Sequence, residues 1–133
     1  MKILLVSQYF YPENFKINDL IFSLKKRGHD ITVLTGKPNY SKTTFFEGYG
    51  WKSNDLETIF DIPIYRANLF SRGNGGAVRL FLNYISFAIF ALFKIKKIKG
   101  PFDVIFVYQT SLVTVGIPAV LAKKVFKAPI YFW

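Results

Sequence analysis

Residues 1–36 read MKILLVSQYFYPENFKINDLIFSLKKRGHDITVLTG and carry the strongest signal of the fold class. Residues 2–7 contain an unbroken apolar run, which is typical of a parallel strand covered on both faces. In residues 17–24 the apolar side chains recur with the spacing of one helix face, and residues 30–35 have the composition of a second buried strand. The pattern predicts a βαβ unit at the start of the chain.

The predicted helix has recognisable signals at both ends. Glu13 or Asn14 can cap its first turn, and the cations at 25–27 complement the helix dipole in its last turn. Gly28 suits the position that follows the helix. We therefore expect the helix to begin just after residue 14 and to end before residue 28.

Strands and helices alternate in the rest of the chain. The further predicted elements are strands at 60–66, 102–108 and 129–133, and helices at 77–97 and 114–126. Pro63 cannot donate a ladder hydrogen bond, so the strand at 60–66 is expected at an edge or a bulge. The predicted fold class is α/β, with a Rossmann-like, doubly wound, mostly parallel sheet and helices on both faces.

Composition restricts the class of protein and of partner. The 133 residues are enough for one domain, 1–133, and the 51% content of hydrophobic residues excludes a disordered chain. The net charge of +10 favours an anionic partner: a nucleic acid, a phosphate-bearing substrate or an anionic membrane surface. The chain has no cysteine, which excludes disulfides and thiolate metal sites. The apolar strand at 129–133 is expected to be covered by a longer chain or by a partner.

The candidate site is predicted where the parallel strands end, because open α/β sheets bind ligands at that edge. The loop after the first strand, residues 8–13, has no glycine, which excludes dinucleotide-binding and P-loop motifs. Its tyrosines and polar groups suit a sugar, since rings contact CH faces and polar groups bind hydroxyls. In the turn at 71–76, Arg72 and Asn74 suit a phosphate, although a plain linker is the alternative.

The predicted substrate-binding residues are Gln8, Tyr9, Tyr11, Pro12, Glu13, Asn14, Lys37, Asn39, Tyr40, Arg72, Asn74, Tyr108, Gln109, Ser111 and Thr114. No His or carboxylate pair has metal-ligand spacing, so no metal is expected, and the lone His29 is interpreted as a structural residue of a turn. No Ser/His/Asp set can be assembled, and the catalytic side chain stays unassigned.

The helix predicted at 77–97 allows two interpretations. Residues 80–93 include fourteen positions without a charge, followed by a cluster of lysines, whereas a membrane-spanning helix needs about twenty apolar residues. The helix is either a core helix with a solvated basic end or a helix whose apolar side enters a membrane surface while its lysines meet anionic headgroups. In the second case, Arg79 and Asn83 are placed to face a headgroup.

Three stretches together resemble a known family: residues 2–40, the turn RGNGG at 72–76, and FDVIFVYQTSLVTVGIPA with KAPIYFW at 102–133. They are similar to the N-terminal half of bacterial family 4 glycosyltransferases, in the branch of L-fucosamine-transferase-like enzymes of O-antigen and capsule assembly. The resemblance implies a GT-B enzyme of two Rossmann-like halves. It also implies retaining, metal-independent transfer from a nucleotide-diphosphate sugar, without a further cofactor, to an acceptor such as a polyprenyl-diphosphate-linked sugar.

By this resemblance, the loop at 8–14 would line the cleft, residues 37–40 would flank the acceptor, and residues 108–114 would face the transferred sugar. The family's first-loop glycine pair is missing here, as is the His that some members carry near Gln109. The donor-binding C-terminal half lies outside this sequence, so we expect the 133 residues alone to be nearly inactive. The implied location is cytoplasmic, at the inner face of the bacterial cell membrane, with contact through residues 77–99.

Two other functions remain open at this point. The chain could be a non-catalytic, membrane-associated subunit that binds the acceptor and works with a separate donor-binding chain. A nucleic-acid-binding module is a third candidate, prompted by the charge; it predicts steeply salt-dependent binding of oligonucleotides. No recognised nucleic-acid-binding motif is present, so no nucleic-acid partner is expected.

Overall fold

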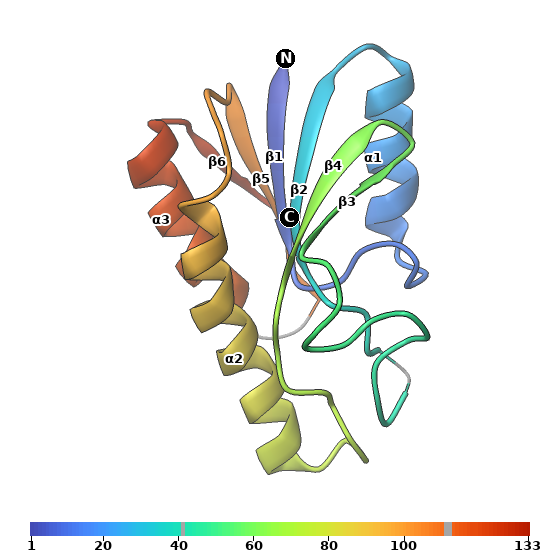
Figure 1. Cartoon of the computed structure of the whole chain (residues 1–133). Helices are drawn as coiled ribbons and strands as arrows, with labels where there is room; N and C mark the ends of the chain where they lie inside the picture. Colours follow the sequence, from blue (N-terminus) through green and yellow to red (C-terminus); the bar gives the residue numbers. More distant parts are fainter. Residues whose placement is uncertain (41, 111–112) are drawn as a thin grey trace.

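The computed structural model describes residues 1–40, 42–110 and 113–133. The elements are β1 (Lys2–Ser7), α1 (Lys16–Lys26), β2 (Asp30–Gly36), β3 (Leu56–Ile59), β4 (Ile62–Ala67), α2 (Ala77–Ile95), β5 (Val104–Tyr108), a 3-10 turn (Val113–Val115), α3 (Gly116–Phe126) and β6 (Ile130–Phe132). Figure 1 shows these elements along the chain.

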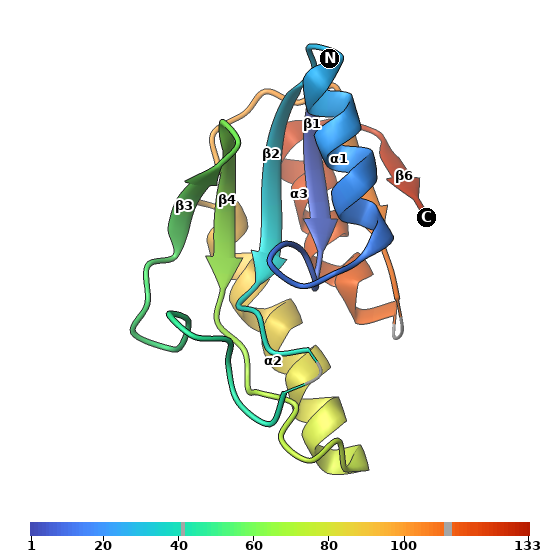
Figure 2. The same cartoon turned by 90° about the vertical axis from the view of Figure 1, so that its right-hand side faces the viewer.

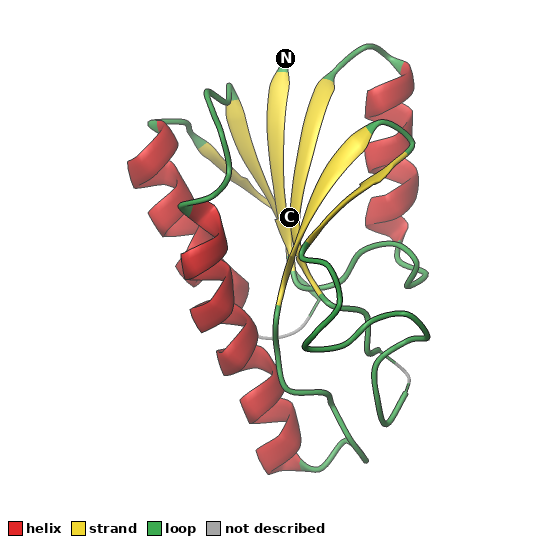
Figure 3. Cartoon of the chain, viewed as in Figure 1, coloured by secondary structure: helices red, strands yellow, loops and turns green. Residues whose placement is uncertain are grey.

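The six strands form one sheet in the order β3-β4-β2-β1-β5-β6. All neighbours are parallel except β3, which runs antiparallel to β4. Helix α1 covers one face of the sheet, and α2 and α3 cover the other (Figures 1 and 3). The predicted α/β class, with a mostly parallel sheet and helices on both faces, is confirmed.

Two apolar layers hold the helices against the sheet. Alternate residues of β1 belong to different layers, because side chains point to opposite faces along a strand. Leu4 and Val6 pack with Phe87 of α2 and Ala119 of α3. The other layer comprises residues of β1, β2 and β4 together with Ile17 and Ile21 of α1 and their neighbours. The unbroken apolar run of β1 thus reflects burial on both faces of a central strand.

Two local predictions are wrong. The residue that precedes α1 is Phe15, and no side chain caps the helix; Glu13 instead accepts hydrogen bonds from the backbone of another loop. Pro63 lies in β4, which has β2 on one side and β3 on the other. The edge belongs to β3, a strand that the sequence pattern did not predict. Arg66 donates its backbone N–H to the carbonyl of Asp55 on the β3 side, and the direction of these groups alternates along a strand. The nitrogen of Pro63, three residues earlier, therefore faces β2, just before the β2–β4 pairing begins at Ile64, so the missing donor interrupts no ladder bond to β3.

The long helix α2 is only partly covered. By length and composition alone it could cross a membrane, yet nearly half of the stretch that meets this criterion is buried within the fold. Its buried side includes Phe87, Ala91 and Ile95. Along the remaining side several large apolar side chains are exposed: Val78, Phe81, Leu82, Ile89 and Phe93. The core-helix interpretation is therefore confirmed for the buried side of α2, and entry of its exposed side into a membrane surface stays a prediction.

Candidate functional site

The loops that follow β1, β2 and β4 meet the N-terminal half of α2 beyond the sheet edge at which these three strands end (Figure 2). The ring of Tyr9 stacks on Phe15, with 5.1 Å between ring centroids, and lies edge-on to Tyr40 at 5.2 Å. Tyr9 is almost completely buried. The predicted approach of Tyr9 and Tyr40 therefore occurs, and Phe15 joins them.

Arg72 is held among three tyrosines. Its guanidinium carbon lies 4.8 Å from the ring centroid of Tyr40, and its Nη1 donates hydrogen bonds to the hydroxyls of Tyr9 at 2.7 Å and Tyr84 at 3.4 Å. Burial raises the pKa of Tyr9 well above its ordinary value, although the charge of Arg72 opposes the shift. Tyr9 therefore stays a neutral phenol, and the positive charge of Arg72 is not cancelled by a phenolate.

No carboxylate pairs with Arg72 in the described parts of the chain. A pocket of about 480 Å³ opens beside its side chain. The residues that line it are Tyr40, Lys42, Thr43, Arg72, Gly73, Asn74 and Gly75. Its volume is in the range of small-molecule sites, and its charged groups are two cations. The pocket can take a ligand that carries both an anionic group and a flat apolar face.

One buried amide joins all the loops around Arg72. Asn83 of α2 is fully buried, and its Oδ1 accepts hydrogen bonds from Gln8 Nε2 at 2.7 Å and from the hydroxyl of Tyr9 at 3.3 Å. Its Nδ2 donates to Asn39 Oδ1 at 3.0 Å and to the carbonyl of Phe70 at 2.6 Å. The prediction that Asn83 faces a headgroup is wrong, because its hydrogen-bonding capacity is used inside the protein.

Glu13 supports the loop that follows β2. It is only 2% exposed, and its Oε1 accepts the backbone N–H groups of Asn39 at 2.8 Å and of Tyr40 at 2.7 Å. Burial raises the pKa of Glu13 to about 7, although those same N–H groups lower it. The position of Tyr40 against Arg72 therefore depends on a carboxyl group that changes its charge near neutral pH.

The pH dependence of stability tests this assignment. Because the pKa of Glu13 is 4.5 in the unfolded chain and about 7 in the folded one, the folded state favours the protonated form. This contribution is complete below pH 4.5 and is lost as the pH rises to about 7. From about pH 5 to pH 8 we expect the wild type to lose about 3 kcal/mol of unfolding free energy relative to Glu13→Gln.

Urea denaturation of both proteins at the two pH values measures this difference. Other titrating groups contribute equally to the two proteins and cancel. Parallel pH profiles of the wild type and Glu13→Gln would contradict the assignment.

Several predicted site residues lie elsewhere. Lys37 is fully buried, donates to the carbonyls of Gly50 at 2.6 Å and Ser53 at 3.0 Å, and pairs with Asp55 at 3.1 Å. It therefore shapes the loop at 37–55 and does not line the pocket. The ring of Tyr11 packs against Phe22 of α1 and Phe60, with centroid separations of 6.0 Å and 6.2 Å.

The residues predicted after β5 form a separate group. The ring of Tyr108 contacts Trp133 at 5.4 Å, and the backbone N–H of Gln109 donates to the carbonyl of Trp133. Thr114 lies in the short 3-10 turn, and Ser111 is outside the described residues. Tyr108, Gln109 and Thr114 do not line the pocket beside Arg72. The remaining predicted residues are Pro12, in a cis peptide bond with Tyr11, and Asn14, which is exposed.

The sequence pattern missed Phe15, Lys42, Thr43 and Tyr84. Phe15 immediately precedes α1 and Tyr84 lies within α2. An aromatic residue at either place usually signals a core contact, so no sequence signal separates the two from ordinary packing. Lys42 and Thr43 lie in the long loop after β2, where length alone indicated a functional segment.

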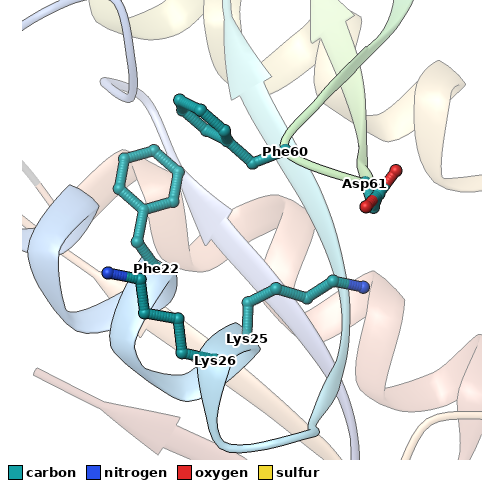
Figure 4. Close-up of a pocket in the computed structure, with 5 residues that line it drawn as sticks. All are labelled: Phe22, Lys25, Lys26, Phe60 and Asp61. Atoms are coloured by element: carbon teal, nitrogen blue, oxygen red, sulfur yellow. The ribbon is translucent and has the colours of Figure 1, made fainter.

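A second hollow of about 430 Å³ lies between the end of α1 and the β3–β4 turn, and Figure 4 shows the residues that line it. They are Phe22, Lys25, Lys26, Phe60 and Asp61. Because β4 begins at this turn, the hollow lies at the opposite edge of the sheet from Arg72. It contains none of the predicted site residues.

Among the described residues, no group of three or more His, Cys, Asp or Glu side chains could hold a metal ion. No protein-family model matches the sequence, and no curated protein matches it. The fold and the cluster around Arg72 are therefore the structural observations that bear on function.

Proposed function

We propose that this chain is the acceptor-binding N-terminal half of a glycosyltransferase of the retaining GT-B type. The enzyme transfers a sugar from a nucleotide-diphosphate sugar to a polyprenyl-diphosphate-linked or other glycan acceptor in the synthesis of a cell-surface polysaccharide. The proposal rests on the family resemblance of residues 2–40, 72–76 and 102–133. Its structural support is the pocket beside Arg72.

The single observation that carries the proposal is an arginine without a carboxylate partner in the described chain, surrounded by tyrosine rings. An arginine in this setting suits a phosphate oxygen, since charge-assisted hydrogen bonds to phosphate are strong. Tyr40 offers an aromatic face to the nonpolar side of a sugar. A sugar joined to a diphosphate carries a phosphate and a sugar ring next to each other, as the neighbouring Arg72 and Tyr40 require.

The exposed side of α2 supports a lipid-linked acceptor. Its large apolar side chains begin one residue after the start of the helix, and Arg79 lies beside Gly73 of the pocket. Lys96 and Lys97 follow at the other end. Exposed apolar side chains flanked by cations favour the interface of a membrane with anionic lipids. We place the chain at the cytoplasmic face of the bacterial cell membrane, as a peripheral protein.

In this proposal the chain's own contribution is to orient the acceptor hydroxyl toward the anomeric carbon of the donor sugar, which is a proximity effect. The charge of the leaving nucleoside diphosphate is stabilised by groups of the donor-binding half. No metal or cofactor takes part beyond the nucleotide sugar as co-substrate. The catalytic side chain is not assigned.

The binding part of the proposal is tested with Arg72→Gln. We expect this variant to bind phosphatidylcholine vesicles containing a polyprenyl-diphosphate-linked sugar about tenfold more weakly than the wild type, because one charge-assisted hydrogen bond to phosphate is lost. Vesicle co-sedimentation measures the affinity. Lys26→Gln, which removes an equal charge near the opposite edge of the sheet, is the control and is expected to bind nearly normally. Equal binding by Arg72→Gln and the wild type would contradict the proposed site.

The catalytic part is tested by assaying the full-length gene product with a panel of UDP-sugars and polyprenyl-diphosphate acceptors. Transfer by that product supports the glycosyltransferase. Transfer only after addition of a separate donor-binding chain supports instead the acceptor-binding subunit. If no sugar is transferred with or without the added chain, and the protein binds RNA tightly, both the glycosyltransferase and the acceptor-binding subunit are ruled out.

A further inference from the structure

A third hollow, beside the C-terminal end of α2, combines cations from one helix end with polar groups from the β3–β4 hairpin. Its volume is about 620 Å³. The residues that line it are Asn54, Asp55, Leu56, Tyr65, Lys94, Lys97 and Lys99. None of them belongs to the cluster around Arg72, which lies near the other end of α2.

The one carboxylate in this hollow is already neutralised. Asp55 Oδ1 lies 3.1 Å from Nζ of the buried Lys37, and Oδ2 pairs with Nζ of Lys94. Although partial burial raises the pKa of Asp55, hydrogen bonds from Lys94 and Lys37 lower it below its ordinary value. Asp55 therefore remains ionised, fixes Lys94 in the wall of the hollow and leaves a net positive charge behind it.

Lys97 and Lys99 contribute two further charges. Both are exposed, and neither forms an ion pair with a carboxylate within residues 1–40, 42–110 and 113–133. Three lysines and one carboxylate thus line the hollow, and the buried Lys37 adds a fourth positive charge behind that carboxylate. Asn54 and Tyr65, whose side chains carry neutral donors, also line the hollow. Cations at a helix end ordinarily complement the helix dipole, but here they converge on a concavity that the β3–β4 hairpin completes.

We propose that this hollow binds a phosphate group. A phosphate carries more charge than a carboxylate and accepts several hydrogen bonds at once, which matches several lysines around one space. The phosphate can belong to a soluble phosphorylated compound or to the headgroup of an anionic lipid. This site is separate from the acceptor site proposed at Arg72.

Titration of the ¹⁵N-labelled chain with sodium pyrophosphate tests the proposal. The backbone amides of Leu56 and Lys97 report on this hollow, and those of Gly73 and Asn74 report separately on the pocket at Arg72. The two proposals can therefore fail independently. A second arm measures binding to phosphatidylcholine vesicles with and without phosphatidylglycerol.

The variant is Lys97→Gln with Lys99→Gln, and the matched control is Lys123→Gln with Lys124→Gln, which removes two exposed lysines from the end of α3. We expect the first variant to weaken binding about tenfold and the control to change it less than about twofold. If the Lys97/Lys99 variant alone binds pyrophosphate more weakly, the ligand is a soluble phosphate. If it alone binds more weakly only to vesicles with phosphatidylglycerol, the ligand is a lipid headgroup. Equal loss in both variants, or no binding by the wild type in either arm, overturns the proposal.

Discussion

Replacement of Asn83 by leucine is expected to lower the free energy of unfolding by about 4 kcal/mol. Leucine has a similar size but offers no polar atom, so the four hydrogen bonds of this fully buried amide are lost together. Gln8, Asn39 and the carbonyl of Phe70 then lose a partner in the interior. Leaving buried polar groups without partners costs about 1–3 kcal/mol each when nothing else compensates. Urea denaturation measures the loss.

Asn14→Leu is the control for the same chemical change. Asn14 is exposed, so we expect this substitution to change the free energy of unfolding by less than about 0.5 kcal/mol. A comparably small effect of Asn83→Leu would show that the loops after β1, β2 and β4 do not depend on this amide.

Substitution of Gly36 by alanine is expected to destabilise the fold by about 3 kcal/mol. A Cβ atom at Gly36, the last residue of β2, would lie 2.5 Å from Cδ2 of Leu69 and 2.9 Å from the carbonyl oxygen of Gln8. Leu69 is fully buried, and the carbonyl of Gln8 accepts the backbone N–H of Gly36. Neither neighbour can retreat without moving the core or the loop after β1.

Thermal denaturation followed by circular dichroism measures this effect. The matched control is Gly50→Ala, because a Cβ at Gly50 would meet no atom within 4 Å. We expect the control to shift the midpoint by only a few degrees in either direction. If Gly36→Ala were as stable as Gly50→Ala, close approach of these loops would not be a requirement of the fold.

The parallel core of the sheet was predictable because its signals are local. The strand at 2–7, the helix before Gly28 and the strand from residue 30 each have an apolar period that neighbouring residues define by themselves. In contrast, β3 is short and half exposed, and its burial alternates weakly, so its pattern does not differ from that of a polar loop. Its existence depends on pairing with β4 across the Phe60–Asp61 turn.

The candidate site was predictable only in part. Tyr9, Tyr40 and Arg72 were identified because they follow predicted strands or lie in a glycine-rich turn. Asn83 was assigned to a headgroup because its spacing from Arg79 suggested one exposed helix face. The structure turns Asn83 inward, toward Gln8 and Asn39. Helical spacing specifies which residues share a face, but the packing of the helix decides which face is buried.

The class of fold and the sheet edge at which a ligand would be sought were predictable from the amino-acid pattern, since both depend on the order of strands and helices along the chain. Which polar residues support that edge from within, and which remain open to solvent, depends on long-range packing. Lys37 and Glu13 look in the sequence like groups available to a ligand, yet both are buried and bonded to backbone. Arg72 stays without a carboxylate partner in the described chain because the nearby loops offer it tyrosines. The partners of these side chains are distant in sequence and meet only on folding, so no local sequence pattern predicts the contacts.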